Sequence, residues 1–409
     1  MDNKKMVPEI RFPGFTDPWE QRKLIDYLEV SKLKNKNEIF GKEDVLSVSG
    51  DFGVVNQIEF QGRSFAGVSV APYGVVDTGD VIYTKSPLKS NPYGIIKTNK
   101  GKPGIVSTLY AVYKPLDNVY SEFVQIYFEQ DARMNNYMHP LVNKGAKNDM
   151  KVSDENVLKG EVSFPSKDEQ IKISAFFAKL DDLITLHQRK CDAIKKYKKG
   201  MLQKMFPKNG EKYPEVRFPG FTDPWEQRKL GDTFDFLQNN TLSRADLTTE
   251  IGVAKNVHYG DVLIKVGEYL DASSSALPYI PSRQIVDKFK GSLLQDGDVI
   301  MADTAEDETV GKCTEIAGLQ SFPTISGLHT IPLRPKDNFA SGYLGYYMNS
   351  GSYHDQLLPL MQGIKVTSVS KSAILNTDIL YPADSDEQAE IGRFFIQLDS
   401  LITLHQRHY

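Results

Sequence analysis

The clearest pattern of apolar positions lies in two related segments, residues 168–189 and 386–407, where apolar side chains recur at alternating steps of four and three. That spacing places them on one face of an α-helix and forms a seam that a second helix must cover. The first segment predicts a long helix from about Asp168 to Phe206. The predicted helical-pair seam consists of Ile173, Phe177, Leu180, Ile184, His187, Ile391, Phe395, Leu398, Ile402 and His405.

The two seams predict an antiparallel helical pair. The first helix, of roughly 40 residues at about 1.5 Å each, would be ~60 Å long. The second copy has no counterpart of residues 192–206, so we expect a shorter helix. Two seams in one chain are most simply covered by each other, although each helix could instead pack on its own domain. We interpret His187 and His405 as packing residues of the seam and not as ligands.

Elsewhere the pattern changes to short apolar runs bounded by Gly, Pro, Asn and Asp, which is typical of strands and turns. Helical stretches follow near 121–134 and 341–356. The sequence therefore predicts an α+β protein with strand-rich domains. The predicted strands lie within Val45–Val48, Val81–Tyr83, Gly104–Tyr113, Val299–Met301 and Thr330–Leu333.

The chain contains an internal repeat. Residues 8–24 return at 214–230 with 16 of 17 positions identical, and 168–189 return at 386–407 with 15 of 22 identical. Near-identical segments around divergent ones indicate one architectural unit used twice, with a pseudo-twofold relation between the helices. We expect six parts: a framework segment 1–24, domain 25–167, a spacer helix and linker 168–213, a repeated framework segment 214–230, domain 231–385 and a short second helix 386–409.

The divergent domains are themselves related through landmarks that keep their order. Gly79-Asp80 corresponds to Gly297-Asp298 at an offset of 218, and Lys114-Pro115 corresponds to Arg334-Pro335 at an offset of 220. Gly145 and Lys147 correspond to Gly363 and Lys365. Conserved turns within altered surroundings predict one fold with different loops.

Composition and charge narrow the class of protein. The 409-residue chain has a net charge of −4, and residues 231–385 hold 11 basic and 19 acidic residues. Any DNA contact must therefore use local basic patches. No apolar run approaches the ~20 residues of a membrane helix, and the N-terminus lacks the apolar core of a signal peptide, so we expect a cytoplasmic protein with no membrane contact. Cys191 and Cys313 lack metal-ligand spacing, so no metal site is predicted.

A search for catalytic motifs predicts no catalytic residue. The chain has no GxxxxGK[ST] phosphate loop, no GxGxxG and no HExxH. Asn91-Pro92-Tyr93-Gly94 lacks the second proline of the motif of amino-methyltransferases, and we interpret it as a turn. We expect no cofactor to be bound by this chain.

Two variable domains, each preceded by RFPGFTDPWEQRKL and followed by a DEQ…FF…LD…LITLHQR helix, resemble the specificity (S) subunit of type I restriction–modification systems. The resemblance covers essentially the whole chain. It implies a non-catalytic subunit with two target-recognition domains, each reading one half of a bipartite double-stranded DNA site, while the helical pair sets the gap between the halves.

The resemblance also implies the partners. Two modification (methyltransferase) subunits carrying S-adenosylmethionine would methylate adenine N6. Restriction subunits, which are ATP-dependent translocases and nucleases that use Mg²⁺, would join for cleavage. Because the framework repeats are nearly identical, two identical modification subunits would bind equivalent surfaces.

Base readout requires Arg, Lys, Asn, Gln, Ser or Thr on loops that can enter a groove, and phosphate contact requires Lys or Arg. In the first domain the loop residues that meet this requirement are Lys32, Lys34, Asn35, Lys36, Lys85, Ser86, Lys89, Asn91, Lys144, Lys147 and Asn148. In the second they are Asn239, Asn240, Ser243, Arg244, Arg283, Thr304, Gln362 and Lys365.

Two other functions are compatible with the sequence. One is a stand-alone DNA-binding protein such as a repressor, against which the large repeated framework and the low basicity argue. A structural coiled-coil adaptor between two protein-binding domains would suit the acidic second domain. Salt-dependent DNA affinity distinguishes a DNA reader from an adaptor.

Overall fold

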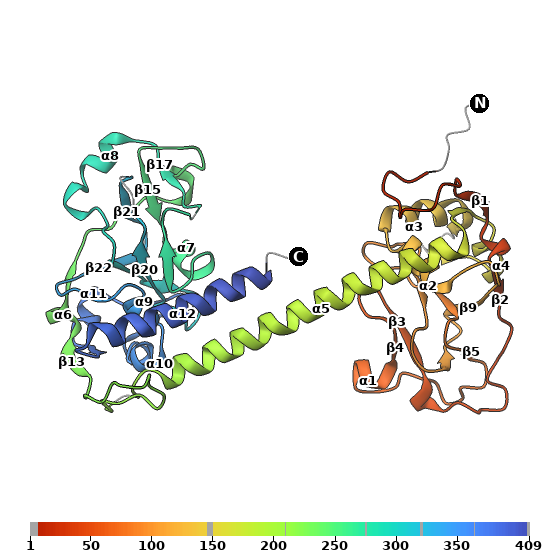
Figure 1. The fold of residues 1–409 in the computed structure, drawn as a ribbon, viewed down its shortest axis with the longest axis horizontal. Helices are drawn as coiled ribbons and strands as arrows, with labels where there is room; N and C mark the ends of the chain where they lie inside the picture. The colour runs from red at the N-terminus through yellow and green to blue at the C-terminus, as the bar shows by residue number, and fades with distance from the viewer. Residues whose placement is uncertain are drawn as a thin grey trace. The chain divides into compact units, whose positions relative to one another are not determined.

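The computed structural model describes residues 7–144, 150–208, 210–274, 276–319, 322–363 and 365–406. The chain forms two compact units, Met1–Leu183 and Ile184–Tyr409, and their boundary falls inside the longest helix, α5 (Lys167–Lys204) (Figure 1). Both units are rich in short strands, which confirms the predicted α+β class. Within the described part of the chain, none of the helices is long and apolar enough to cross a membrane.

The core of unit 1 is an antiparallel sheet with four short helices beside it. Its strand order is β2 (Leu28–Val30), β9 (Tyr110–Pro115), β6 (Val81–Thr84) and β7 (Ile96–Thr98). The helices are α1 (Gln57–Gln61), α2 (Ser121–Phe128), α3 (Asp131–Met138) and α4 (Asp154–Val157). The two-stranded ladders are β1 (Glu20–Lys23) with β12 (Glu161–Phe164), β3 (Leu46–Ser49) with β4 (Gly53–Asn56), β5 (Gly74–Val76) with β8 (Gly104–Val106), and β10 (Asn143–Lys144) with β11 (Met150–Lys151).

Unit 2 repeats this arrangement with an extra strand. Its main sheet has the order β14 (Phe234–Phe236), β22 (Thr330–Pro335), β18 (Val299–Ala302), β20 (Cys313–Ala317) and β16 (Tyr269–Asp271). The smaller sheets are β17 (Tyr279–Ile280), β15 (Ala254–Val257) and β21 (Thr324–Ser326), then β13 (Glu226–Lys229) with β24 (Asp378–Tyr381), and β19 (Thr304–Ala305) with β23 (Thr367–Ser368). The helices are α6 (Leu230–Thr233), α7 (Tyr259–Ile264), α8 (Arg283–Asp287), α9 (Tyr343–Met348), α10 (Gly351–His354), α11 (Lys371–Ile374) and α12 (Ser385–Gln406).

The sequence landmarks occupy equivalent places in the two sheets. Asp80 accepts a hydrogen bond from Lys114 at 2.7 Å between β6 and β9, and Asp298 accepts one from Arg334 at 2.6 Å between β18 and β22. The glycine before each aspartate has a positive φ, 91° and 90°, which favours glycine because a side chain is strained there. The prediction of one fold used twice is therefore confirmed.

One predicted strand run, Gly104–Tyr113, is two strands in the structure. The N–H of Tyr110 donates to the carbonyl of Ser107 at 3.1 Å, which closes a turn between β8 and β9. The apolar residues on both sides of this turn are buried, so periodicity gave no sign of the break. A corresponding turn, at residues 328–329, precedes β22 in unit 2.

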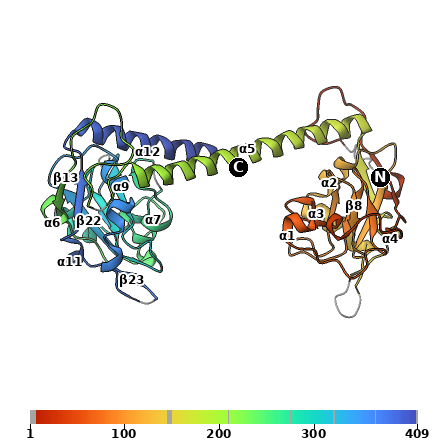
Figure 2. The same ribbon diagram turned by 90° about the horizontal axis from the view of Figure 1, so that it is seen from below.

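The C-terminal part of α5 and helix α12 lie side by side in unit 2 (Figures 1 and 2). Nδ1 of His187 is 2.9 Å from Nδ1 of His405, and the ring of Phe206 stacks on that of Phe395 at 5.9 Å. Residues later in α5 therefore contact residues earlier in α12, which means that the two helices are antiparallel, as predicted.

The seam residues fall into two groups. Ile391, Phe395 and Leu398 are buried in the core of unit 2, Ile402 is half-buried, and His405 contacts His187. On α5, Ile173 packs partly against the core of unit 1, whereas the side chains of Phe177, Leu180 and Ile184 are exposed. The described part of α12 ends beside His187, so these three positions precede the paired stretch of α5.

A buried carboxylate in unit 2 predicts a pH effect on stability. Glu315 on β20 accepts hydrogen bonds from the N–H groups of Gly342, at 2.6 Å, and Gly345, at 2.9 Å. Burial raises the pKa of Glu315 from its ordinary 4.5 to about 7, and the two hydrogen bonds oppose this only in part.

Between pH 4.5 and 7 the unfolded chain releases this proton before the folded chain does, so the stability of unit 2 falls as pH rises, by on the order of 3 kcal/mol. Below pH 4.5 both states hold the proton and the effect disappears. Urea unfolding of the wild type and Glu315→Gln at pH 5 and pH 8 measures this. Glutamine does not titrate, so the variant should lose this part of the slope, and equal slopes would contradict the assignment.

Candidate nucleic-acid interface

Each framework segment is fixed to the start of its helix by a bidentate ion pair. Nε and Nη2 of Arg11 donate to Glu169 at 2.8 and 2.7 Å, and the same atoms of Arg217 donate to Glu387 at 2.7 and 2.7 Å. Both glutamates are almost fully buried. The hydrogen bond to Glu387 raises the pKa of Arg217, as a stable ion pair requires.

The glutamine that follows each glutamate connects the helix to its domain. Gln170 accepts from the N–H of Tyr120 at 2.8 Å and donates to the carbonyl of Pro165 at 2.9 Å. Gln388 accepts from the N–H of Ala340 at 3.0 Å and donates to Pro382 at 2.8 Å. The repeated DEQ sequence thus places each domain on its helix by the same contacts.

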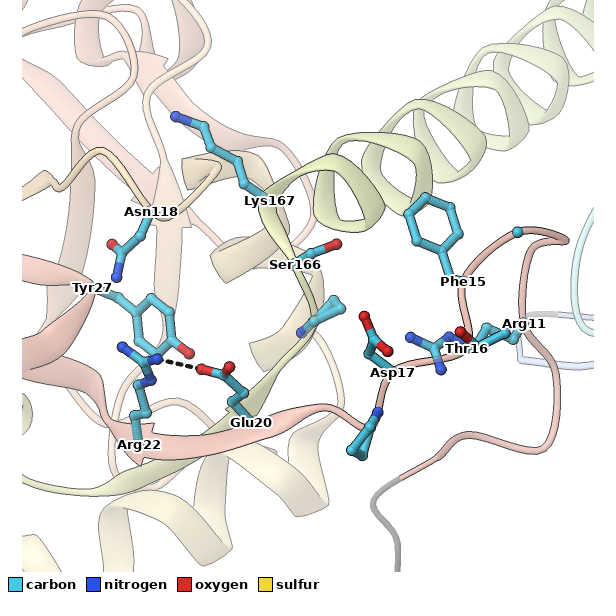
Figure 3. A pocket seen from close by; sticks show the side chains of 13 residues that line it. Arg11, Phe15, Thr16, Asp17, Glu20, Arg22, Tyr27, Asn118, Ser166 and Lys167 are labelled. Atoms are coloured by element: carbon cyan, nitrogen blue, oxygen red, sulfur yellow. Dashed lines mark ion pairs between the residues drawn. The ribbon is translucent and has the colours of Figure 1, made fainter.

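Figure 3 shows the first framework segment as it passes the start of α5. Phe15 reaches toward the first turn of the helix, and Nζ of Lys172 lies 5.0 Å from the centre of its ring. Arg11, Asp17 and Lys167 line the hollow beside it. Arg11, Phe15 and Asp17 belong to the repeated sequence and return as Arg217, Phe221 and Asp223, whereas Lys167 and Lys172 are replaced by Ser385 and Glu390 in the second copy.

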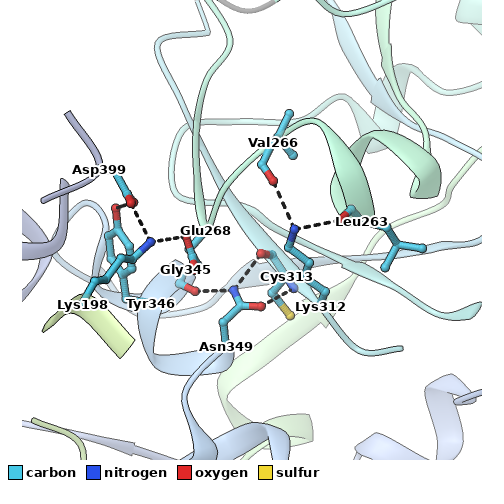
Figure 4. A network of polar contacts seen from close by, with 10 residues as sticks. All are labelled: Lys198, Leu263, Val266, Glu268, Lys312, Cys313, Gly345, Tyr346, Asn349 and Asp399. Carbon is cyan, nitrogen blue, oxygen red and sulfur yellow. Dashed lines mark hydrogen bonds and ion pairs between the residues drawn. The ribbon is translucent and has the colours of Figure 1, made fainter. Parts of the chain in front are cut away.

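Lys198 fixes the C-terminal part of α5 to unit 2 (Figure 4). Its Nζ donates to Glu268, before β16, at 2.7 Å and to Asp399, on α12, at 2.6 Å. Tyr346 on α9 donates to the same Asp399 at 2.6 Å, and the Lys198 ammonium lies 5.1 Å from the centre of its ring. A lysine at a seam position therefore joins α5, α12 and the segment that precedes β16.

Replacing Lys198 with methionine is expected to lower the free energy of unfolding of unit 2 by about 1–3 kcal/mol. Methionine keeps the apolar stem but leaves the half-buried Glu268 and Asp399 next to each other without their cation. Urea unfolding followed by circular dichroism measures the change. Lys195→Met, on the exposed face of the same helix, is the control and should have almost no effect.

The variable loops of both units gather at the same end of the main sheet. In unit 1 the N–H of Lys85 donates to the carbonyl of Leu109 at 3.1 Å, and in unit 2 the N–H of Asp303 donates to the carbonyl of His329 at 3.1 Å. These bonds join the residue after β6 or β18 to the residue before β9 or β22. Equivalent backbone positions therefore carry different side chains in the two domains.

Around His329 the structure brings together several polar and aromatic groups. Its Nδ1 lies 3.4 Å from Oδ1 of Asp303 and 3.4 Å from the hydroxyl oxygen of Thr304, and Tyr259 packs edge-on against its ring at 5.3 Å. Arg244 donates to Asp261 at 2.6 Å in the same region, next to His258. Burial, followed by the positive charge of Arg244, lowers the pKa of His258.

A hairpin adds the remaining predicted residues of this region. Thr304 on β19 pairs with Ser368 on β23, and Gln362 bridges to the same Ser368. Lys365 is exposed in the connecting turn. In Figure 2 the hairpin marked by the β23 label projects from the body of unit 2. Thr304 and Gln362 thus share Ser368 as a partner and Lys365 lies in the same hairpin, whereas Arg244 pairs with Asp261 near His258.

The other predicted residues of unit 2 have different positions. Asn240 is 1% exposed and its amide donates to Asn256 and Ser326, so it holds the fold together. Asn239 is half-buried and donates to the carbonyl of Gly327 at 3.2 Å. Ser243 donates to Asp246 at 2.7 Å in a local capping box. Arg283 lies on α8, where it pairs with Asp287 at 3.8 Å.

In unit 1 two of the predicted amides are structural. Asn35 is buried, donates to the carbonyl of Phe40 at 2.9 Å and accepts from the N–H of the same residue. Asn91 is buried and donates to Asp131 at 2.7 Å. Their side chains have no surface to offer a base, so we leave them out of the proposed interface.

The predicted lysines of unit 1 whose side chains the structure describes are exposed or half-buried. Lys85 is half-buried and pairs with Asp154 at the start of α4 at 2.6 Å. Lys32, Lys34, Lys36, Ser86 and Lys89 are exposed. Lys144 lies on β10, and Lys147, Asn148 and the landmark Gly145 lie outside the described residues, so these stay predictions.

Sequence reasoning missed the residues that end the turns, Leu109 and His329. Neither belongs to the residue types chosen for phosphate contact, and each adjoins a strand that was expected to be core. The signal was nevertheless present, because both positions obey the offset of 220 that relates Lys114 to Arg334.

The two cysteines are buried free thiols, and burial raises the pKa of Cys313 far above its ordinary value. Among the described residues, no group of three or more His, Cys, Asp or Glu side chains is placed to hold a metal ion. A reactive-thiol role therefore finds no support in the geometry.

Comparison with known proteins supports the interpretation of the repeat. Residues 222–409 match the family described as type I restriction modification DNA specificity domain. Curated proteins gave no match. Among solved structures, the chain is similar to the type I restriction–modification S subunit from M. genitalium, with 11% identity, 98% of this chain and 94% of that chain covered and a TM-score of 0.52.

A second similar structure is described as the structural basis of complex assembly and conformational transition of the type I R-M system. Its identity to this chain is 16%, the match covers 98% of this chain and 94% of that chain, and the TM-score is 0.50. At such low identity these likenesses establish the fold. The family match covers the second half of the chain, and the repeat carries the same framework into the first half. Residues 222–409 belong to the family of type I restriction–modification DNA specificity domains.

Proposed function

We propose that this non-catalytic subunit reads a bipartite double-stranded DNA site, with residues 25–167 reading one half and residues 231–385 the other. The observation that carries the proposal is the contrast between framework and loops. The same Arg–Glu and Gln contacts hold both domains, while equivalent loop positions carry Lys85 and Asp303, or Leu109 and His329. One scaffold with two sets of side chains is what two different half-sites require.

The helical pair would set the unread gap between the half-sites. In an antiparallel pair, the two near-identical framework segments would be related by a pseudo-twofold axis. Two identical modification subunits would therefore bind equivalent surfaces. In this proposal adenine N6 methylation, with S-adenosylmethionine, occurs on the modification subunits. ATP-dependent cleavage with Mg²⁺ occurs on the restriction subunits. The whole complex would act in the cytoplasm, where the DNA is.

The proposed DNA contacts combine exposed or half-buried basic and polar side chains near the end of each sheet. In unit 1 they are Lys32, Lys34, Lys36, Lys85, Ser86 and Lys89. In unit 2 they are Arg244, Thr304, Gln362 and Lys365. Because the second domain is acidic overall, this local set must supply its phosphate contacts.

Salt dependence of DNA binding tests the proposal. The subunit assembled with its modification subunits is titrated into a fluorescent duplex that contains its site, at several salt concentrations. Each phosphate contact should lower the logarithm of affinity by about 0.9 per tenfold rise in salt. No DNA affinity at low salt, despite a stable assembly, would favour the adaptor function. Affinity without sequence preference would exclude the specificity role.

A further inference from the structure

We propose that Leu109 and His329 are the specificity-determining residues at one equivalent position of the two recognition domains, with Leu109 contacting an apolar base group and His329 a polar base edge. The inference rests on the proposed function and assigns the readout to single side chains. Both residues end the turn that precedes the longest strand of their sheet, β9 or β22.

The equivalence of the two positions follows from strand register. Thr84 is opposite Tyr110 at the end of the β6–β9 ladder, and Ala302 is opposite Thr330 at the end of the β18–β22 ladder. The residue before Tyr110 is Leu109, and the residue before Thr330 is His329. The backbone carbonyl of each accepts the 3.1 Å hydrogen bond from the residue that follows β6 or β18.

Both side chains are presented to solvent although they adjoin buried strands. Leu109 is 61% exposed, and the side chain of His329 is 48% exposed. An exposed leucine next to a core strand contributes little to folding, because its apolar surface remains in water. Exposure at one equivalent place in both domains, with opposite chemistry, is what readout of two different half-sites requires.

Hydrogen bonds fix the turn that carries His329. His329 has a φ of 54°, in the left-handed region that residues other than glycine rarely adopt. The hydroxyl of Thr330 donates to the carbonyl of Gly327 at 2.5 Å, and Asn240 donates to that of Ser326 at 3.0 Å. Because these hydrogen bonds fix the turn around the strained residue, His329 is preorganised for contact and little conformational entropy is lost on binding.

The groups around the His329 imidazole occupy one of its two nitrogen atoms and leave the other available. Nδ1 faces Asp303 and Thr304, and Tyr259 supports the ring edge-on, while Nε2 has no partner among the described residues. Nε2 can therefore exchange a hydrogen bond with a base edge in the major groove. Leu109 has no polar atom in its side chain and fits the C5-methyl group of thymine.

Selection from a pool of randomised DNA duplexes tests both assignments together. The wild-type subunit, Leu109→Ala and His329→Gly are each assembled with the modification subunits, and the retained duplexes are sequenced. Glycine adopts the positive φ of residue 329 without strain, so His329→Gly removes the imidazole and keeps the turn. Each variant is the matched control for the other, because the unaltered half-site reports on folding and assembly.

His329→Gly should turn one base position of a single half-site degenerate and weaken binding to the wild-type site about 10- to 100-fold. Leu109→Ala should relax one position of the other half-site, with about a 5-fold loss. If the wild type selects a two-part motif and both variants select the same motif unchanged, the inference is overturned and the proposed function stands. If the wild type selects no motif, the proposed function fails and the inference fails with it.

Discussion

Arg217→Ala is expected to lower the free energy of unfolding of unit 2 by about 3–5 kcal/mol, the largest single effect on stability that the structure predicts. Glu387 is 1% exposed and accepts two hydrogen bonds from Arg217 and a third, at 3.3 Å, from Nε1 of Trp225. Removing the guanidinium leaves a buried carboxylate without its cation. The cost is mainly the desolvation of that charge and not the loss of one contact.

Urea unfolding followed by circular dichroism measures the loss. Arg228→Ala is the matched control, because Arg228 belongs to the same repeated segment and forms its ion pairs with Glu226 and Asp337 on the surface. It should unfold almost as the wild type does. The double variant Arg217→Met with Glu387→Leu should recover much of the stability, since it removes both charges and fills the space. Equal stability of Arg217→Ala and Arg228→Ala would contradict the role assigned to the ion pair of Arg217 with Glu387.

Exchange of residues 25–167 for the corresponding segment of another family member is expected to replace one half-site completely. The second half-site and the gap should stay as they were. The physical reason is that Arg11, Glu169 and Gln170 lie outside the exchanged segment, and that Gln170 bonds only backbone groups inside it, the N–H of Tyr120 and the carbonyl of Pro165. The new domain would therefore be seated on α5 in the same way as the old one.

Sequencing of duplexes retained from a randomised pool measures this outcome. The reciprocal exchange of residues 231–385 is the control and should change the other half-site only. If either exchange altered both half-sites, the two domains would not read DNA independently. If an exchange altered the gap and not a half-site, the spacing would be a property of the domains and not of the helical pair.

The repeat predicted much of the fold because its signals are local. Heptad spacing located α5 and α12 to within a few residues, and the landmark pairs Asp80–Lys114 and Asp298–Arg334 are ion pairs between equivalent strands. Lys198 could not be predicted as a core residue. It is a charged residue at a seam position, and its burial depends on two carboxylates distant in sequence, those of Glu268 and Asp399.

The recognition loops were predictable only in part, for a similar reason. Choosing residues by hydrogen-bonding type selected Asn35, Asn91 and Asn240, whose amides are used up by nearby backbone and side-chain groups. An asparagine in a loop serves the turn as readily as a ligand. Leu109 and His329 are exposed because of the turn that each strand follows. The type of a residue does not reveal its position relative to such a turn.

The measurement that tests the central claim most directly is a genome-wide map of N6-methyladenine in a host without adenine methylation, after co-expression of this chain with its modification subunit. The account predicts one two-part motif with a fixed gap, absent when this chain is omitted. A continuous, undivided motif would contradict the use of two recognition domains. Methylation that did not depend on this chain would contradict its role in specificity.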